Sequence, residues 1–331
     1  MSGARFLRLQ PGVYAPVPTP FKSDGIEEID ITVFESTVYR IAKAGVGVLI
    51  GGTLGEGHLL SRDERATLIK SAKKALRHAG LCDEIPVITG IVGASVRECI
   101  SQAEEAASSG ADAVIVALPA YFAFVYGSDR AAVSGFFTSV ADKSPLPLII
   151  YNIPFAAGGV DLDAQALMVL SEHQNITGVK LTCCNIAKGH RLALHVNAPE
   201  YQARHRLPFL VLPGSTDYLL PALVARQHGC IGGPANLYPK TCMKLYQTAV
   251  EALETGNFEM LRQAQALQDL VTEADSVINK VGFLGIKTAM HIHVDDAIGE
   301  SFRKPLTGLG PSAKEELKDG LRKIFEYENT L

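Results

Sequence analysis

The sequence predicts a (β/α)8 barrel with a C-terminal helical extension. Short apolar runs alternate with longer amphipathic stretches, and these runs are apolar along both faces, as in a parallel sheet covered by helices. Eight such units in about 240 residues match a barrel, whereas a doubly wound open sheet usually has fewer strands. The expected strands are GVYAPV at 12–17, GVLI at 47–50, PVITGI at 86–91, DAVIVAL at 112–118, LPLIIYN at 146–152, ITGVKL at 176–181, PFLVLP at 208–213 and GCIGG at 229–233.

The C-terminal part of the chain has a different pattern. Beyond residue 235 no strand is evident, and the segments 237–256, 257–278 and 311–329 have the periodicity of amphipathic helices. No linker or low-complexity segment separates them from the strands. We therefore expect a single structural domain, in which a barrel over residues 1–235 carries a helical extension over residues 236–331.

Composition restricts the class of protein. The 331 residues are 47% apolar and 20% charged, with a net charge of −4, which favours neither a nucleic-acid nor an acidic-membrane partner. No apolar run has the length of a membrane span, and the N-terminal stretch lacks the apolar core of a signal peptide. The six cysteines show no C-x-x-C spacing and are expected as reduced thiols. These features favour a cytoplasmic protein that binds a small molecule.

Polar motifs follow the predicted strands at the end where barrel enzymes place their chemistry. They are GGTLGEG after the second strand, PAYF after the fourth, YNIP at the end of the fifth, Lys180 at the end of the sixth, PGSTD after the seventh and GGPAN after the eighth. All six are therefore expected on one rim of the barrel.

The glycine-rich turn GGTLGEG has the composition of an anion-binding loop, because glycine lets backbone N–H groups approach a ligand closely. A P-loop would continue with Lys and Ser or Thr, but His58 and Leu59 follow here. The dinucleotide-binding pattern also fails, since Ile50 occupies the place of its third glycine. The motif thus predicts an anion site without naming the anion.

Lys180 is unusual because it lies in a strand-like apolar run. Burial favours the neutral amine, which attacks a ketone and forms a Schiff base. A structural ion pair, or a side chain that extends to the rim, is the alternative interpretation. Lys287 is a weaker candidate for the nucleophile, because it follows the eighth strand.

Tyr151 ends the neighbouring strand and is therefore expected near Lys180, where a phenol relays protons. A core aromatic residue with a satisfied hydroxyl is the alternative. Thr53 is positioned to hydrogen-bond that phenol or an anion, and the N–H groups around it form a carboxylate nest. For Glu56, capping of the helix that begins near Ser61 is the favoured role.

Taken together, GGTLGEG, YNIP and GVK resemble the N-acetylneuraminate lyase and dihydrodipicolinate synthase family of class I aldolases, in the family's order along the chain. The similar layout runs from about residue 12 to about residue 305. The resemblance implies that Lys180 bonds C2 of a 2-keto acid, that Tyr151 relays protons with support from Thr53, and that the turn at 53–54 binds the carboxylate. Tyr121 matches a family tyrosine that reaches into a neighbouring subunit.

Two departures from the family pattern concern the ligand. Leu54 stands where many members have a second hydroxyl, so a side-chain bond to the carboxylate is lost. The synthase members have an arginine two residues after the YNIP proline, and here that residue is Ala156. The sugar-binding members use polar groups after the seventh and eighth strands and two residues beyond the lysine. The matching residues here are Thr182, Gly214, Ser215, Thr216, Asp217 and Gly233.

Hydroxyls with one carboxylate suit a polyol. The expected reaction is therefore cleavage of a 2-keto-3-deoxy sugar acid, with 2-keto-3-deoxy-L-galactonate of D-galacturonate catabolism as the favoured substrate and pyruvate and L-glyceraldehyde as products. Cleavage of 4-hydroxy-2-oxoglutarate and a synthase-like condensation are the alternatives within the family. The resemblance also implies a homotetramer built as a dimer of dimers, and no cofactor.

Two further classes remain open from the sequence. In HIHVDD, the residues His291, His293, Asp295 and Asp296 are compatible with a metal-dependent aldolase or hydrolase, although such a pattern more often marks a helix end. A non-catalytic protein with an aldolase-like barrel is expected to lose Lys180 or Tyr151, and both are present.

Overall fold

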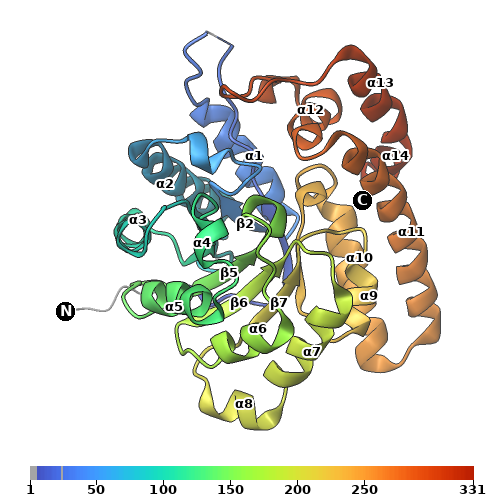
Figure 1. Cartoon of the computed structure of the whole chain (residues 1–331). Coiled ribbons are helices and arrows are strands. Elements are labelled where there is room, and N and C mark those ends of the chain that lie inside the picture. Colours follow the sequence, from blue (N-terminus) through green and yellow to red (C-terminus); the bar gives the residue numbers. More distant parts are fainter. Residues whose placement is uncertain (1–5, 24) are drawn as a thin grey trace.

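The computed structural model describes residues 6–23 and 25–331. Eight parallel strands form one sheet in the order β7-β6-β5-β4-β3-β2-β1-β8, with helices around it, so the predicted barrel is confirmed (Figure 1). The strands are β1 Gly12–Pro16, β2 Gly47–Ile50, β3 Val87–Ile91, β4 Ala113–Ala117, β5 Leu148–Asn152, β6 Ile176–Leu181, β7 Leu210–Pro213 and β8 Gly229–Ile231. Each lies within a run that the sequence predicts as a strand.

The barrel is nearly closed between β7 and β8. His228, directly before β8, donates its backbone N–H to the carbonyl of Val211 in β7 at 3.0 Å. Its ring Nδ1 accepts the Val211 N–H, also at 3.0 Å, and its Nε2 contacts the Asn197 side-chain oxygen at 2.9 Å. Burial lowers the pKa of His228 to about 4, so the ring is neutral and Nδ1 is free to accept. A side chain thus replaces part of a missing strand pair.

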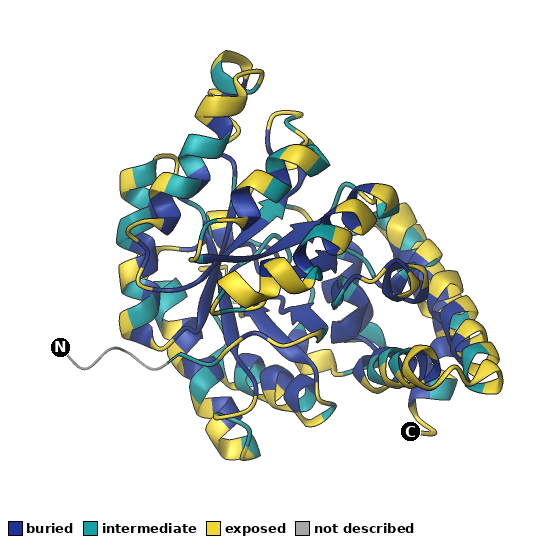
Figure 2. Cartoon of the chain, turned by 90° about the horizontal axis from the view of Figure 1, so that it is seen from below, coloured by how far each residue is buried: buried dark blue, intermediate teal, exposed yellow. Residues whose placement is uncertain are grey.

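Strand side chains alternate between two apolar layers. Leu49, Ile88, Ile115, Ile149 and Leu212 belong to the cluster that fills the barrel. Their strand neighbours pack outward against the helices, in the larger cluster between sheet and helices. Figure 2 shows the resulting arrangement, with buried strands in the middle and exposed residues along the outer faces of the helices.

The helices are α1 Ile31–Lys43, α2 Arg62–Ala79, α3 Val96–Ser109, α4 Ala123–Tyr126, α5 Arg130–Ala141, α6 Ala164–Ser171, α7 Ile186–Val196, α8 Pro199–Arg204, α9 Leu219–Val224, α10 Pro239–Thr255, α11 Phe258–Val281, α12 Leu284–His293, α13 Pro311–Gly320 and α14 Arg322–Glu328. Helix α2 begins at a capping box, in which Ser61 and Glu64 each accept the other's backbone N–H. No helix within residues 6–23 and 25–331 has the length and apolarity to cross a membrane.

The C-terminal helices cover one flank of the barrel. Helix α10 contacts both β1 and α11, and α11 runs beside it as the longest helix of the extension (Figure 1). The division at residue 235 stays a prediction, because α10 joins the barrel to the extension.

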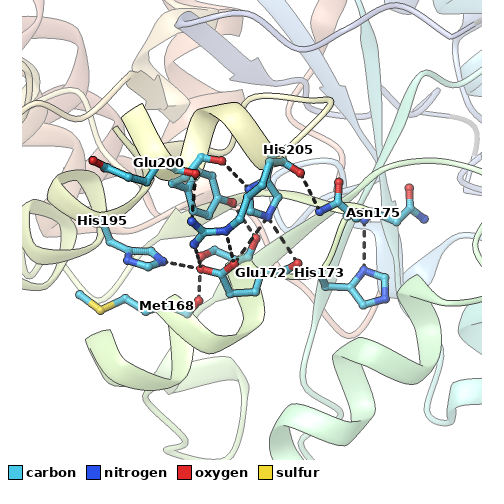
Figure 3. A network of polar contacts seen from close by, with 11 residues as sticks. Met168, Glu172, His173, Asn175, His195, Glu200 and His205 are labelled. Carbon is cyan, nitrogen blue, oxygen red and sulfur yellow. Dashed lines mark hydrogen bonds and ion pairs between the residues drawn. The ribbon is translucent and has the colours of Figure 1, made fainter. Parts of the chain in front are cut away.

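A polar network joins α6, α7 and α8 (Figure 3). Glu172 forms ion pairs with Arg204 at 2.7 Å and with His195 at 2.9 Å, and hydrogen bonds from Arg204 lead the contacts that lower the pKa of Glu172. Glu172 lies between α6 and β6, and Arg204 ends α8 ahead of β7, so the network lies at the amino ends of these two strands. Barrel enzymes place catalytic residues at the other end, which assigns this network to the scaffold.

Candidate active site

Lys180 points into the barrel at the carboxyl end of β6. Its neighbours Val179 and Leu181 pack in the outer apolar layer, so the alternation of the strand directs Lys180 inward. The residue is only 4% exposed. Its amine contacts Tyr151, donating to the hydroxyl at 3.2 Å and lying 4.4 Å from the ring centroid.

Tyr151 lies opposite Lys180 in the pairing of β5 with β6. Its hydroxyl is 3.4 Å from the Thr53 hydroxyl, so the amine and two hydroxyls form a continuous line. Burial raises the pKa of Tyr151, but the Lys180 charge and the contacts with Thr53, Lys180 and Thr182 outweigh it, and the net shift is downward. The phenol is therefore tuned toward proton exchange at the position where the sequence predicts a relay.

The turn after β2 has the tight backbone that its glycines imply. Gly57 donates its N–H to the Gly52 carbonyl at 3.0 Å, and a Cβ on Gly57 would lie 1.8 Å from the Gly51 oxygen. Within the part of the chain that the structure describes, the N–H groups of Thr53 and Leu54 donate to no protein acceptor. Two adjacent free donors beside the Tyr151 hydroxyl form a nest for an anion.

The Leu54 side chain faces the turn after β8. A Cβ built on Gly233 would lie 3.4 Å from Leu54 Cδ2, so these two predicted site residues adjoin. The structure thus brings the segments after β2 and β8 together at the carboxyl end of the barrel.

Glu56 does not cap α2, as the sequence suggested, because the capping box of Ser61 and Glu64 fills that role. Instead its side chain is buried in an ion pair with Lys287, and it also accepts the Arg303 backbone N–H at 2.9 Å. Burial lowers the pKa of Lys287, and the Glu56 carboxylate opposes that shift. Removing one partner of such a pair typically costs about 3–5 kcal/mol. Lys287 therefore holds the turn in place, and Lys180 is the lysine that faces the barrel interior.

Thr182 lies just beyond β6, and its buried hydroxyl lies close enough to the Tyr151 phenol to lower the pKa of Tyr151, but it forms no well-aligned hydrogen bond with any described residue. A Cβ on Gly214 would lie 2.3 Å from that hydroxyl, so glycine is needed there. Buried hydroxyls are nearly always paired, and one left unpaired beside a candidate nucleophile is a ready partner for a ligand.

The polar side chains of the loop after β7 differ in their partners: some bind α11, and one keeps an unpaired oxygen. Thr216 is fully buried, and its hydroxyl donates to Asp275 of α11 at 2.7 Å, with Ser215 Oγ at 3.5 Å from the same oxygen. Sequence reasoning gave the Thr216 hydroxyl to the substrate, whereas the structure uses it within the protein. Asp217 keeps one buried carboxylate oxygen unpaired among the described residues.

Tyr121 is 80% exposed, and the hydrogen bonds of Tyr151 among the described residues join it to Thr53 and Lys180 rather than to Tyr121. Its ring packs edge-on against Phe122, with the centroids 4.9 Å apart. The relay role that the sequence gave to Tyr121 therefore depends on a second subunit.

The HIHVDD segment ends α12, as the helix-end interpretation expects. His293 stacks on Phe325 with ring centroids 4.4 Å apart, while His291 Nδ1 contacts the Asp296 carbonyl at 2.9 Å. Residues 6–23 and 25–331 contain no group of three or more His, Cys, Asp or Glu arranged to hold a metal ion.

Two surface hollows of about 670 and 890 Å³ lie away from Lys180. Both are lined by Phe6 and Leu7, and by residues that precede β3 to β7, so they lie at the amino ends of the strands. That is the end of the barrel where barrel enzymes do not place their chemistry.

Comparison with known proteins identifies the family. Residues 10–324 match the dihydrodipicolinate synthetase family. The L-threo-3-deoxy-hexylosonate aldolase of Hypocrea jecorina is 34% identical over 97% of this chain and 98% of its own length. The probable mitochondrial 4-hydroxy-2-oxoglutarate aldolase of Emericella nidulans is also 34% identical, over 98% of this chain and 97% of its own. A dihydrodipicolinate synthase family protein from Coccidioides immitis has a solved structure with TM-score 0.81, 31% identity and coverage of 97% and 98% of the two chains.

The chain therefore belongs to the dihydrodipicolinate synthetase family, as its motifs predicted. Its family and its aldolase relatives define it as a pyruvate-dependent carbon–carbon lyase.

Proposed function

We propose that the chain is a class I aldolase that cleaves 2-keto-3-deoxy-L-galactonate to pyruvate and L-glyceraldehyde in D-galacturonate catabolism, through a Schiff base on Lys180. The observation that carries this proposal is the line from the Lys180 amine to the hydroxyls of Tyr151 and Thr53, at 3.2 and 3.4 Å. The name of the Hypocrea jecorina relative supports a 3-deoxy-hexulosonate as substrate.

The reaction begins at the ketone. Once it has given up its proton, the Lys180 amine attacks C2 of the substrate, and loss of water leaves an iminium. Tyr151 is within hydrogen-bond distance of the amine and passes protons to and from the oxygen that departs as water. The iminium then serves as the electron sink that a metal provides in other aldolases, so the proposal names no cofactor.

The Tyr151 hydroxyl also acts in the cleavage step. Tyr151 takes the proton of the C4 hydroxyl, the C3–C4 bond breaks, and its electron pair moves into the iminium to give an enamine. The three-carbon aldehyde leaves, the enamine takes a proton at C3, and water releases pyruvate from Lys180. The free N–H groups of Thr53 and Leu54 bind the carboxylate next to C2, without a second hydroxyl at position 54.

The aldehyde half of the substrate meets uncharged or acidic groups. The unpaired atoms Thr182 Oγ1 and Asp217 Oδ1 suit the hydroxyls of a sugar chain. The segment 155–159 after β5 contains no cationic side chain, and Phe155 and Ala156 are exposed. An aldehyde that bears its own carboxylate lacks a partner here.

In the condensation direction we therefore expect glyceraldehyde to be preferred over glyoxylate and over aspartate semialdehyde. An unpaired buried polar group costs about 1–3 kcal/mol, which corresponds to roughly five- to 150-fold in kcat/KM. The measurement is kcat/KM for each aldehyde at saturating pyruvate. Ala156→Arg is the matched variant, and it should raise kcat/KM for aspartate semialdehyde relative to glyceraldehyde.

Cleavage of 4-hydroxy-2-oxoglutarate is the alternative reaction, because the name of the Emericella nidulans relative gives that compound as substrate. That reaction yields glyoxylate. If glyoxylate is the best acceptor, cleavage of 4-hydroxy-2-oxoglutarate replaces the sugar-acid proposal, and if aspartate semialdehyde is best, a synthase-like condensation replaces it.

We also propose a homotetramer built as a dimer of dimers. An exposed aromatic patch on α4 and on the loop after β5 supports self-association. The two segments pack together, since a Cβ on Gly158 would lie 2.4 Å from the side chain of Ala123 in α4. This α4 patch consists of Tyr121, Phe122, Phe124, Val125 and Phe155. Exposed apolar clusters of this kind mark protein interfaces.

Phe124→Glu should break the interface, because Phe124 is 82% exposed in the single chain and a charge there resists burial. Sedimentation velocity should then change from four times the 35.4 kDa chain mass to a smaller species. Phe258→Glu, at an exposed position of α11, is the control. A wild-type protein that sediments as a monomer would refute the assembly.

A cytoplasmic location completes the proposal. All six cysteines are free thiols, which suits a reducing compartment. The Emericella nidulans relative is named as mitochondrial, and the mitochondrial matrix is the alternative location.

A further inference from the structure

One face of α11 carries a stripe of polar side chains toward the barrel. Gln268, Thr272 and Asp275 recur at the spacing of one helical face. Gln268 and Asp275 are buried, although such residues normally remain in water. All three contact the loop after β7, and we call them the α11 stripe.

The stripe binds this loop at both ends. Gln268 accepts the Leu220 N–H at 2.8 Å and donates to the Thr216 carbonyl at 3.1 Å. Thr272 donates its hydroxyl to the Asp217 carbonyl at 2.8 Å and accepts from Gln268 at 3.1 Å. The backbone on both sides of the Asp217 side chain is therefore fixed by α11.

Asp275 extends this network to the segment after β8. It accepts from the Thr216 hydroxyl at 2.7 Å and from the Tyr238 hydroxyl at 2.6 Å, which links the loop after β7 to the segment after β8. Burial raises the pKa of Asp275 to about 7, although these hydrogen bonds oppose the shift. A carboxyl group buried without a cation is costly, and this one holds the side-chain hydroxyls of Thr216 and Tyr238 in place.

We propose that the α11 stripe is a set of positioning residues that determine how the lyase recognises the aldehyde half of its substrate. The inference rests on the proposed function, in which Asp217 and the neighbouring loop contact that half. The groups that bind pyruvate come from elsewhere, namely from Lys180, Tyr151 and the turn after β2. Substitutions in the α11 stripe should therefore impair recognition of the aldehyde and leave the binding of pyruvate unchanged.

The first test is Asp275→Ala against Asp269→Ala, an exposed aspartate of the same helix outside the stripe. We expect kcat/KM for glyceraldehyde to fall about tenfold or more in Asp275→Ala, since three hydroxyl donors lose their acceptor. The KM for pyruvate and the yield of borohydride trapping with pyruvate should stay within about twofold of wild type. Asp269→Ala should match wild type in all three measurements.

A second pair of variants tests the inference even if Asp275→Ala does not fold. Thr272 is exposed, so Thr272→Val removes one hydroxyl with little effect on the core, and Thr272→Ser restores that hydroxyl. We expect Thr272→Val to lower kcat/KM for glyceraldehyde about three- to tenfold and Thr272→Ser to recover it. An unchanged kcat/KM in Thr272→Val, or an equal loss of pyruvate trapping, overturns the inference.

The wild-type protein separates this inference from the proposed function. If wild type neither traps pyruvate nor uses glyceraldehyde, the proposed function fails, and the inference fails with it. If wild type does both and the stripe variants do not discriminate between the two halves, the inference alone fails.

Discussion

Lys180→Ala is expected to abolish both turnover and the trapping of pyruvate by borohydride. In wild type, the reagent should add one reduced pyruvate to the peptide that contains Lys180. The loss of turnover should exceed about 10³-fold, because no other group of the site forms the covalent bond. The burial of Lys180 and its 3.2 Å contact with Tyr151 are the structural basis.

Mass spectrometry of the trapped protein tests the assignment directly. Lys287 is the internal control, because its amine is occupied by Glu56 and by the Ser301 carbonyl at 2.9 Å. Lys143→Ala, which changes an exposed lysine, should trap pyruvate as wild type does. Label on Lys287, or full activity in Lys180→Ala, would remove Lys180 from the mechanism.

Local sequence patterns predicted the central pair of the site. The apolar run around Lys180 predicts a strand, and the parallel order of neighbouring strands brings Tyr151 beside it. Both inferences need only the recognition of apolar strands and the rule that barrel chemistry lies at the carboxyl ends. The register of Tyr151 opposite Lys180 shows that these two rules suffice for neighbouring strands.

Contacts between distant segments could not be predicted in this way. Glu56 pairs with Lys287, which lies 231 residues further along the chain, and no periodicity relates the two. The capping role expected for Glu56 was wrong, because Ser61 and Glu64 already form a complete capping box at the start of α2. The spacing of Ser and Glu in SRDE is the sequence pattern of such a box. The link from Thr216 to Asp275 likewise depends on how α11 packs, which only the tertiary structure supplies.

Tyr151→Phe is expected to keep the fold and lose most turnover. The ring stays in place, so packing between β5 and β6 is preserved, and only the hydroxyl between Lys180 and Thr53 is removed. General acid–base catalysis by a positioned group is typically worth about 10² to 10⁴ in rate. We expect a loss of kcat within that range, because proton transfer is needed both to form the iminium and to break the C3–C4 bond.

Single-turnover kinetics distinguish this role from a structural one. Cleavage of 2-keto-3-deoxy-L-galactonate should slow by the full factor in Tyr151→Phe, while the circular dichroism spectrum and the thermal midpoint remain close to wild type. Tyr39→Phe, on the exposed side of α1, is the matched loss of one phenolic hydroxyl and should leave the rate unaltered. A loss below about threefold in Tyr151→Phe lies far under the contribution of a proton relay and would exclude Tyr151 from that role. The Lys180 amine would then have to exchange protons with water, since among the described residues the Thr53 hydroxyl is linked to it through Tyr151.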